Sequence, residues 1–418
     1  MQEQARRAAR AVDGAGQWDR LARLGAIGAI PGGGVCRLAL TAEDMAARRL
    51  MLEWAAELDL EPATDAFGNL FLRLPGTRPE APPVVSGSHL DTQPHGGRFD
   101  GAYGVVAALE AVRAMRKAGL TPRRPVDVVA WTNEEGSRFP PGTMGSMVFT
   151  GLTDLAHAAA IVDRDGVALG DALPAFLAAT PDLPLRPFGT PMAAYVEAHI
   201  EQGPVLEAAD EQVGVVTGIQ GSRWFQVSVR GEDAHAGTTP PALRRDALRQ
   251  ACSMVDALHQ VFDNGDDRVR FTVGRFDVDP GSPNTIAGGV DFTIDFRHPE
   301  SAVIHALSVR VAPTCQGHAG PCGVSVRELR DVPPVSFDLD VIRLIDDMAA
   351  GLGYRYRRMN SGAGHDAEHL AHVCPTGMVF VPCRGGRSHT VTEDARPEDL
   401  AAGTAVLAAS LTALSEAS

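Results

Sequence analysis

The first part of the chain alternates between helical and strand-like patterns of apolar residues. Residues 41–58 begin with a threonine that can cap a helix and an aspartate three positions later, and apolar residues then recur at helical spacing. The apolar runs at 84–85 and 126–131 are short and bounded by turn residues, as buried strands are. The Ala- and Val-rich segment 104–119 between them predicts a helix. Strand, helix and strand in this order imply a parallel sheet with a right-handed crossover.

The pattern changes at about residue 218, where segments with strict alternation of apolar and polar residues begin. Strand-like patterns cover 224–229, 268–276 and 290–296, and a helical pattern covers 242–262. This mixture predicts a compact α+β domain over 218–333, inserted into a domain that is formed by 1–217 and 334–418.

The segments around this insertion continue the first pattern. We expect a strand at 192–197, a helix after 335, a strand at 379–381 and a last helix at 400–414. The Pro- and Ala-rich stretch 168–191 predicts an irregular excursion. The whole chain therefore predicts an α/β domain with a mostly parallel central sheet, together with the α+β insertion.

Composition and charge narrow the function classes. With 418 residues, 44% hydrophobic and 22% charged, the chain is an ordinary globular protein of about two domains. Its formal net charge of −14 argues against a nucleic-acid or anionic-membrane partner, because the excess of Lys and Arg that neutralises phosphate is missing. No apolar run reaches the ~18 residues of a membrane span. The six cysteines form no CxxC pair and are typical of a reducing compartment, so we expect a cytoplasmic protein.

Imidazole and carboxylate side chains recur where predicted strands end. Five of them stand in Gly-rich or turn-like contexts, namely His89, Asp100, Glu135, His199 and His389. Both side-chain types suit zinc, and a carboxylate has two oxygens with which to bridge two ions. Because open α/β sheets gather their ligands beyond the carboxyl ends of the strands, this pattern predicts a dinuclear metal site.

Several longer motifs surround these residues in a fixed order. They are Gly-Ser-His-Leu-Asp-Thr (87–92), Gly-Gly-Arg-Phe-Asp-Gly (96–101), Asn-Glu-Glu-Gly-Ser-Arg-Phe (133–139), His-Ile-Glu-Gln-Gly-Pro (199–204), Ala-His-Ala-Gly-Thr-Thr-Pro (234–240), Asp-Phe-Arg (295–297) and Ser-Gly-Ala-Gly-His-Asp-Ala (361–367). Together they resemble the hydantoinase/carbamoylase branch of the dinuclear zinc amidohydrolases, relatives of aminoacylases and carboxypeptidase G. This resemblance implies a di-zinc exopeptidase-like catalytic domain and an inserted domain that serves as lid and dimerisation domain.

The resemblance also implies a division of labour among the ligands. His89 and His199 would hold one ion, Glu135 and His389 would hold the second, and Asp100 would bridge both. Zinc is the expected metal, and manganese or cobalt remain open because these ligands discriminate weakly among the three ions.

Two neighbouring carboxylates are expected to assist this centre. Asp91 resembles the carboxylate that fixes the tautomer of a metal-bound imidazole, here that of His89. Glu134 lies next to a ligand without being needed as one, so it is the expected general base, taking a proton from water and passing it to the leaving nitrogen.

The resemblance assigns the substrate contacts as well. Arg297 would clamp a substrate carboxylate with its planar guanidinium, Asn284 and Gln202 would add neutral polar contacts, and Gly364 would let the backbone approach closely.

His235 would stabilise the oxyanion in the active site of a partner subunit, which implies a homodimer. For His365 and Asp366, a local structural role and a functional role are both open.

The favoured function is hydrolysis of an N-carbamoyl amino acid to the amino acid, carbon dioxide and ammonia. An allantoate or N-acyl amino acid amidohydrolase is the alternative, since Arg297 would serve these substrates equally. A noncatalytic binder on the same scaffold is the third hypothesis, although neither Glu134 nor a ligand is missing. A serine hydrolase is disfavoured, because no Gly-x-Ser-x-Gly elbow occurs. Side chain and enantiomer of the substrate stay open.

Overall fold

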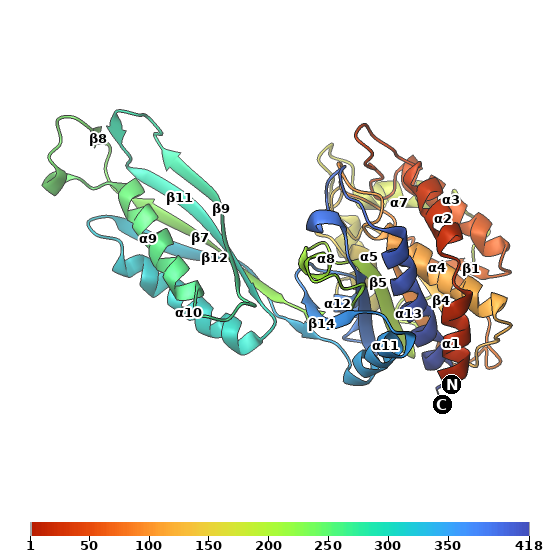
Figure 1. The fold of residues 1–418 in the computed structure, drawn as a ribbon. Helices are drawn as coiled ribbons and strands as arrows, with labels where there is room; N and C mark the ends of the chain where they lie inside the picture. Colours follow the sequence, from red (N-terminus) through yellow and green to blue (C-terminus); the bar gives the residue numbers. More distant parts are fainter. Residues whose placement is uncertain (1, 418) are drawn as a thin grey trace. The chain divides into compact units, whose positions relative to one another are not determined.

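The computed structural model describes residues 2–417, and the chain divides into two units (Figure 1). Unit 1 comprises Met1–Gly218 and Ser336–Ser418, and unit 2 is the intervening Ile219–Val335. Each unit has its own sheet and its own core, so each is described by itself. Within the described residues, no helix is both long and apolar enough to cross a membrane.

The sheet of unit 1 has parallel strands at its centre. Among the described residues it contains nine strands in the order β1-β2-β4-β3-β5-β15-β6-β13, and β14 pairs with β6. Their bounds are β1 (Glu61–Thr64), β2 (Leu70–Leu74), β3 (Val84–His89), β4 (Val126–Trp131), β5 (Ala194–Ile200), β6 (Val213–Ile219), β13 (Val335–Ser336), β14 (Tyr356–Ser361) and β15 (Thr376–Val381). The neighbours β4, β3, β5 and β15 are parallel, whereas β1, β2 and β6 are antiparallel additions at the flanks. The expected α/β fold with a parallel central sheet is confirmed.

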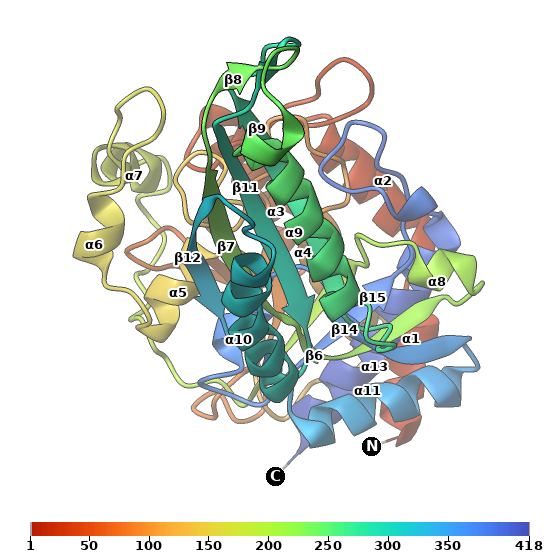
Figure 2. The same ribbon diagram turned by 90° about the vertical axis from the view of Figure 1, so that its left-hand side faces the viewer.

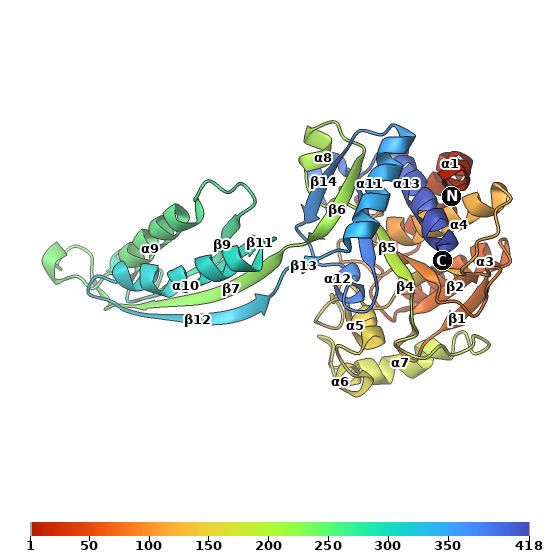
Figure 3. The same ribbon diagram turned by 90° about the horizontal axis from the view of Figure 1, so that it is seen from below.

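Helices bury this sheet. The helices of unit 1 are α1 (Gln2–Ala11), α2 (Gly14–Gly25), α3 (Ala42–Ala56), α4 (Ala102–Lys117), α5 (Met144–Thr150), α6 (Leu155–Ala159), α7 (Leu169–Leu177), α8 (Val205–Ala208), α11 (Leu339–Leu352), α12 (Ala367–Leu370) and α13 (Pro397–Glu416). Helices α4 and α13 pack against β3 and β5, and α1 packs on both helices (Figure 3). Every residue of β3, β4, β5 and β15 is buried, which explains why these strands are short continuous runs in the sequence.

One sequence expectation in unit 1 is wrong. The stretch 168–191 was expected to be irregular, but it begins with α7 (Leu169–Leu177). Leu169, Leu173 and Phe176 lie on one face of this helix and pack into a small buried cluster with Phe67. The many Pro and Ala residues hid this i, i+4, i+7 spacing, and Pro174 stands within the helix itself.

Unit 2 is an antiparallel sheet with two helices on one face. Strands β7 (Gly221–Arg230), β9 (Arg270–Asp279), β11 (Gly289–His298) and β12 (Gly323–Val332) form the order β12-β7-β11-β9, and the short β8 (Ala234–His235) and β10 (Thr285–Ile286) pair with each other. Helices α9 (Ala247–Phe262) and α10 (Ser301–Gly317) lie side by side on the same face (Figure 2).

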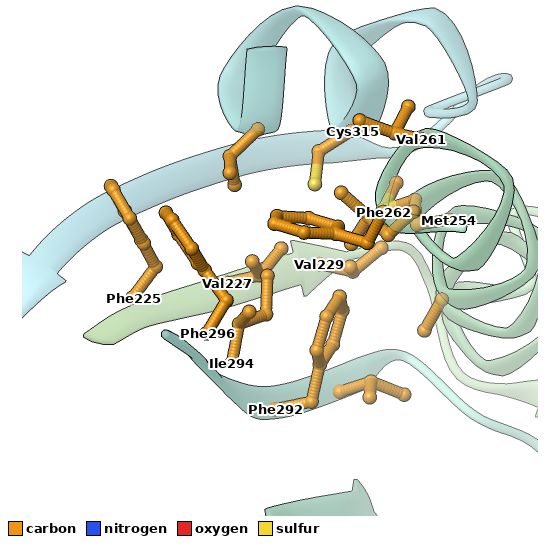
Figure 4. Close-up of a cluster of buried hydrophobic side chains, with 14 of the residues drawn as sticks. Phe225, Val227, Val229, Met254, Val261, Phe262, Phe292, Ile294, Phe296 and Cys315 are labelled. Atoms are coloured by element: carbon orange, nitrogen blue, oxygen red, sulfur yellow. The ribbon is translucent and has the colours of Figure 1, made fainter. Parts of the chain in front are cut away.

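Alternate residues of the strands build the core under these helices. Val227 on β7 and Phe292 on β11 point toward Met254 and Phe262 on α9 (Figure 4). Helix α9 begins five residues later than the expected 242. Asp246 caps it by accepting the N–H of Arg249, whereas the preceding prolines support only a short 3₁₀ turn.

Candidate metal centre and catalytic site

The parallel strands bring the predicted ligands to one edge of the sheet. His89 is the last residue of β3, Glu135 follows β4, and His389 follows β15. His199 is the penultimate residue of β5 and not part of a turn, because this strand runs three residues beyond the expected end. Since β4, β3, β5 and β15 are parallel neighbours, their carboxyl ends meet, and these side chains meet with them.

Asp100 joins these side chains into two clusters. Its Oδ1 lies 3.2 Å from Nε2 of His199 and 3.8 Å from Nε2 of His89. Its Oδ2 lies 3.3 Å from Nε2 of His389, which in turn lies 3.4 Å from Oε2 of Glu135. The two oxygens of one carboxylate therefore face two different sets of ligand-type side chains. In each set the ligand atoms all lie within 4.8 Å of one another, close enough to hold one metal ion.

The donor atoms are spaced as the ligands of two divalent ions would be. Metal–ligand bonds of about 2.1 Å at tetrahedral angles place neighbouring donor atoms roughly 3.4 Å apart, which is close to the separations around Asp100. Burial lowers the pKa of His89 to about 4, whereas contact with Asp100 raises the pKa of His199, against the effect of its burial, and the pKa of His389 to about 9 each. A cation among these side chains would favour the neutral imidazoles that a metal site requires. Beside the clusters, Oε1 of Gln202 is a buried acceptor without a hydrogen-bond partner. The residues present thus fit a dinuclear centre, and Oε1 of Gln202 remains beside it as an unused acceptor.

The backbone around the centre is held in uncommon conformations. Asn133, Gln202 and His389 have φ values of 59°, 57° and 55°, in the left-handed region that non-glycine residues seldom occupy. Gly101 also has a positive φ of 62°, and a Cβ there would collide with the ring of His89. Such conformations cost free energy, and they persist where the surrounding structure imposes a particular side-chain placement.

Glu393 positions Asp100, a role that the sequence did not reveal. Its carboxylate is buried and accepts the backbone N–H groups of Phe99 (2.8 Å) and Asp100 (3.1 Å). It also accepts the hydroxyl of Ser388, which lies 2.7 Å from Oδ2 of Asp100. A hydrogen bond between segments so far apart in the chain leaves no pattern in the sequence. The one available signal was that Glu393 is the last residue of the Ser-His-Thr-Val-Thr-Glu segment that contains His389.

Asp91 does a different job from the expected one. Nδ1 of His89 lies 2.8 Å from the backbone carbonyl oxygen of Asp91, so this carbonyl, and not the carboxylate, orients the ring. The carboxylate instead accepts the backbone N–H groups of Glu134 and Glu135, each at 3.2 Å. We correct the role of Asp91 accordingly: its side chain holds the turn that carries the predicted base and one predicted ligand.

Glu134 lies beside the clusters in a position suited to proton transfer. Its Oε2 is 3.3 Å from Nε2 of His89, and the residue is buried. Burial, followed by the negative charges of Asp366 and Glu135, raises the pKa of Glu134 well above its usual value. Cations at the neighbouring ligands would oppose this effect by favouring the charged carboxylate.

His365 and Asp366, left open by the sequence, are both fully enclosed. The ring of His365 packs edge-on against that of His199, with centroids 4.5 Å apart. Oδ1 of Asp366 accepts the hydroxyl of Ser146, and its Oδ2 is buried without a hydrogen-bond partner. Gly364 directly precedes His365 in the sequence and lies on an exposed part of the same loop.

The remaining predicted residues lie in unit 2. His235 and Asn284 are brought together, because β8 pairs with β10 and the N–H of Ala236 donates to the carbonyl of Asn284 at 3.0 Å. Arg297 lies on β11, where its Nη2 donates to Asp295 at 2.8 Å. These residues thus form two separate places on unit 2, whereas Gln202, whose Nε2 donates to Asp100 at 3.0 Å, belongs to the centre in unit 1.

The chain is similar to a peptidase family and, within it, to amidohydrolases. Residues 85–413 match the model of peptidase family M20/M25/M40. The chain is 40% identical to the N-carbamoyl-L-amino-acid amidohydrolase of Rhizobium meliloti, over 93% of this chain and 94% of that protein. It is 35% identical to the allantoate amidohydrolase of Escherichia coli K12, over 92% and 94%. The crystal structure of an amidase of the hydantoinase/carbamoylase family from Burkholderia multivorans superposes with a TM-score of 0.94 at 43% identity, covering 97% of this chain and 98% of that chain.

Proposed function

The chain belongs to the M20/M25/M40 peptidase family and is an amidohydrolase of its hydantoinase/carbamoylase branch, and on this premise we propose that it cleaves N-carbamoyl amino acids. The products would be the amino acid, carbon dioxide and ammonia. The observation that carries the proposal is the pair of clusters around Asp100 with Glu134 beside them. The relative from Rhizobium meliloti, whose name states this substrate class, supports the choice of substrate.

The residues of the centre divide the chemistry. His89 and His199 on one side of Asp100, and Glu135 and His389 on the other, would each hold a divalent ion, of which zinc is our first choice and manganese or cobalt the alternatives. Such ions supply Lewis acidity that polarises a carbonyl and lowers the pKa of nearby water.

The proton transfers fall to Glu134. It accepts a proton from the attacking water and returns it to the leaving nitrogen, and the hydrogen bonds from its turn to Asp91 hold its backbone in place. Because Asp91 holds the backbone rather than the side chain, the carboxylate of Glu134 keeps the freedom to reach both the water and the nitrogen.

We propose four residues as substrate contacts. Arg297 would bind the substrate carboxylate, and Asp295 keeps its guanidinium oriented. Asn284, Gln202 and the backbone at Gly364 would add polar contacts. Gln202 has the strongest support, since its buried Oε1 lacks a partner and would accept an N–H group of the ureido moiety.

Within one chain, Arg297 and His235 lie at opposite ends of the paired strands of unit 2. Along β11 and β7, Arg297 pairs with Ser222, whereas Gly289 pairs with Arg230. Eight residues (297 − 289) separate these two pairs, which corresponds to about 27 Å along the strands. His235 lies beyond the Arg230 end, because the pairing continues there from Gly231 with Gly288 to His235 with Thr285. An N-carbamoyl amino acid is much shorter than this span, which supports a homodimer in which His235 serves the site of the partner.

Subunit exchange tests this arrangement. His235→Ala and Arg297→Ala should each be nearly inactive, because one removes the oxyanion donor and the other the carboxylate clamp, while metal content stays unchanged. After the two variants exchange subunits, a heterodimer contains one site with both defects and one with neither. Activity should therefore return, up to half the wild-type value per heterodimer. If native mass spectrometry detects heterodimers and no activity returns, both residues act within one chain and the cross-subunit assignment is wrong.

A substrate panel tests the proposed activity itself. We expect ammonia release from N-carbamoyl α-amino acids to exceed that from N-carbamoyl-β-alanine and from allantoate. Faster turnover of allantoate would replace the proposal by the activity named for the relative from Escherichia coli K12. Binding of these compounds without turnover by the metal-loaded protein would instead favour a noncatalytic binder.

All six cysteines are free thiols, which supports the cytoplasmic location that we also propose.

A further inference from the structure

The segment that carries His235 is closed on itself by hydrogen bonds. We call residues 235–244 the His235 loop. The N–H of Thr239 donates to the carbonyl of His235 at 3.1 Å. The guanidinium of Arg244, at the other end of the loop, donates from Nε to the carbonyl of Thr239 at 2.9 Å and from Nη2 to the carbonyl of Ala236 at 2.8 Å. One side chain thus ties both the start and the middle of the loop to its end.

The same loop determines which nitrogen of His235 carries the proton. The backbone N–H of Gly237 donates to Nδ1 of His235 at 3.0 Å. A backbone N–H can only donate, so Nδ1 must accept and carries no proton, and the neutral ring bears its proton on Nε2. An N–H donor is what stabilisation of an oxyanion requires, and Nε2 is the ring atom that remains for it.

We propose that Arg244 is a positioning residue which, by tying the carbonyls of Ala236 and Thr239, keeps Gly237 against Nδ1 and so presents His235 as a preformed Nε2–H donor. The proposal rests on the oxyanion role proposed for His235. It adds that this donor is prepared before substrate binds, because every hydrogen bond involved lies within unit 2. A donor that is already oriented costs no reorganisation during the reaction.

The next residue in the chain supplies a matched control. Arg245 is also an arginine and is exposed. Its backbone carbonyl accepts the N–H of Glu232, a bond that does not depend on its side chain. The hydrogen bonds that close the His235 loop come from Arg244 and not from Arg245. Lysine cannot replace Arg244 faithfully, since a single ammonium lacks the planar fork that reaches two carbonyls.

A double-mutant cycle tests whether Arg244 acts through His235. Arg244→Gln should lower kcat roughly 10- to 100-fold, the scale of a small misplacement of a catalytic group. Arg244→Lys should fall between this variant and the wild type, and Arg245→Gln should keep the wild-type kcat. In a His235→Ala background, Arg244→Gln should cause no further loss. An unchanged kcat in Arg244→Gln, or losses that multiply in the double variant, would overturn the proposal.

Nitrogen NMR of the full-length protein tests the tautomer without any substrate. In protein with ¹⁵N-labelled histidine, the signals of His235, assigned by their absence in His235→Gln, should show a protonated Nε2 and an unprotonated Nδ1. In Arg244→Gln these shifts should move toward tautomer averaging, and in Arg245→Gln they should not move. An Nδ1–H or averaged ring in the wild type, or an unchanged ring in Arg244→Gln, would contradict the proposal. This measurement decides the matter even if the protein hydrolyses none of the proposed substrates.

Discussion

Replacing Glu134 by glutamine is expected to lower kcat by ~10²–10⁴-fold, the usual contribution of a positioned proton-transfer group. The variant keeps the shape of the side chain, and the hydrogen bonds from the turn to Asp91 involve only backbone N–H groups, so the turn itself should persist. What is lost is the carboxylate that lies 3.3 Å from Nε2 of His89. Steady-state kinetics with metal-loaded protein measure the effect.

Metal analysis of the same variant separates a base from a ligand. Glu134→Gln should keep two divalent ions per chain by elemental analysis. The matched variant Glu135→Gln should bind less metal, because Oε2 of Glu135 faces His389 in the second cluster. If Glu134→Gln loses its metal and Glu135→Gln keeps it, the two roles are reversed.

Chelation is expected to abolish turnover, and zinc, manganese or cobalt should restore it. The physical reason lies in Asp100, whose carboxylate is buried among imidazoles with its two oxygens toward different ligand sets. Without cations, the carboxylates of Glu134 and Glu135 are left close together in a buried place, and burial raises the pKa of Glu135 to about 8. Turnover and metal content should be followed during stepwise addition of the ion.

Thermal unfolding supplies a readout of metal binding that is independent of substrate. Ions that bind only the folded chain raise its stability, so the metal-free protein should unfold at a lower temperature than the reloaded protein. His389→Ala, which removes a ligand of the second cluster alone, should show a smaller gain on reloading. Full turnover after exhaustive chelation, with no metal left in the protein, would exclude a metal-dependent mechanism.

Local patterns predicted much of unit 1. The helix expected at 41–58 is α3, with Thr41 accepting the N–H of Asp44 as its cap. The runs at 84–85 and 126–131 are β3 and β4, and they are parallel. Such elements follow from the sequence because capping and apolar periodicity act between residues that are close in the chain. The prediction for the segment that forms α7 was wrong, because its Pro and Ala content was given more weight than its short apolar spacing.

Side-chain partners between distant segments could not be predicted. Glu393 accepts the N–H of Asp100 across 293 positions of the chain, and His365 packs against His199 from a loop of another part of unit 1. Asp91 was expected to orient His89 with its carboxylate, and the fold directs that carboxylate to another turn instead. No periodicity records such contacts, because they exist only once the sheet has placed the segments side by side.

By itself, then, the sequence determined the central strands and the ligand-type side chains at their ends, because both depend on the order of residues along a few short segments. Only the tertiary structure decided how these side chains are held. It directs the two oxygens of Asp100 toward different ligands, places Glu393 against the backbone of Asp100, and lets Asp91 hold the turn that contains Glu134. It also decided that Arg244 closes the loop of His235. The physical reason is that hydrogen-bond direction depends on the positions of atoms in space, which residue types and spacings leave open.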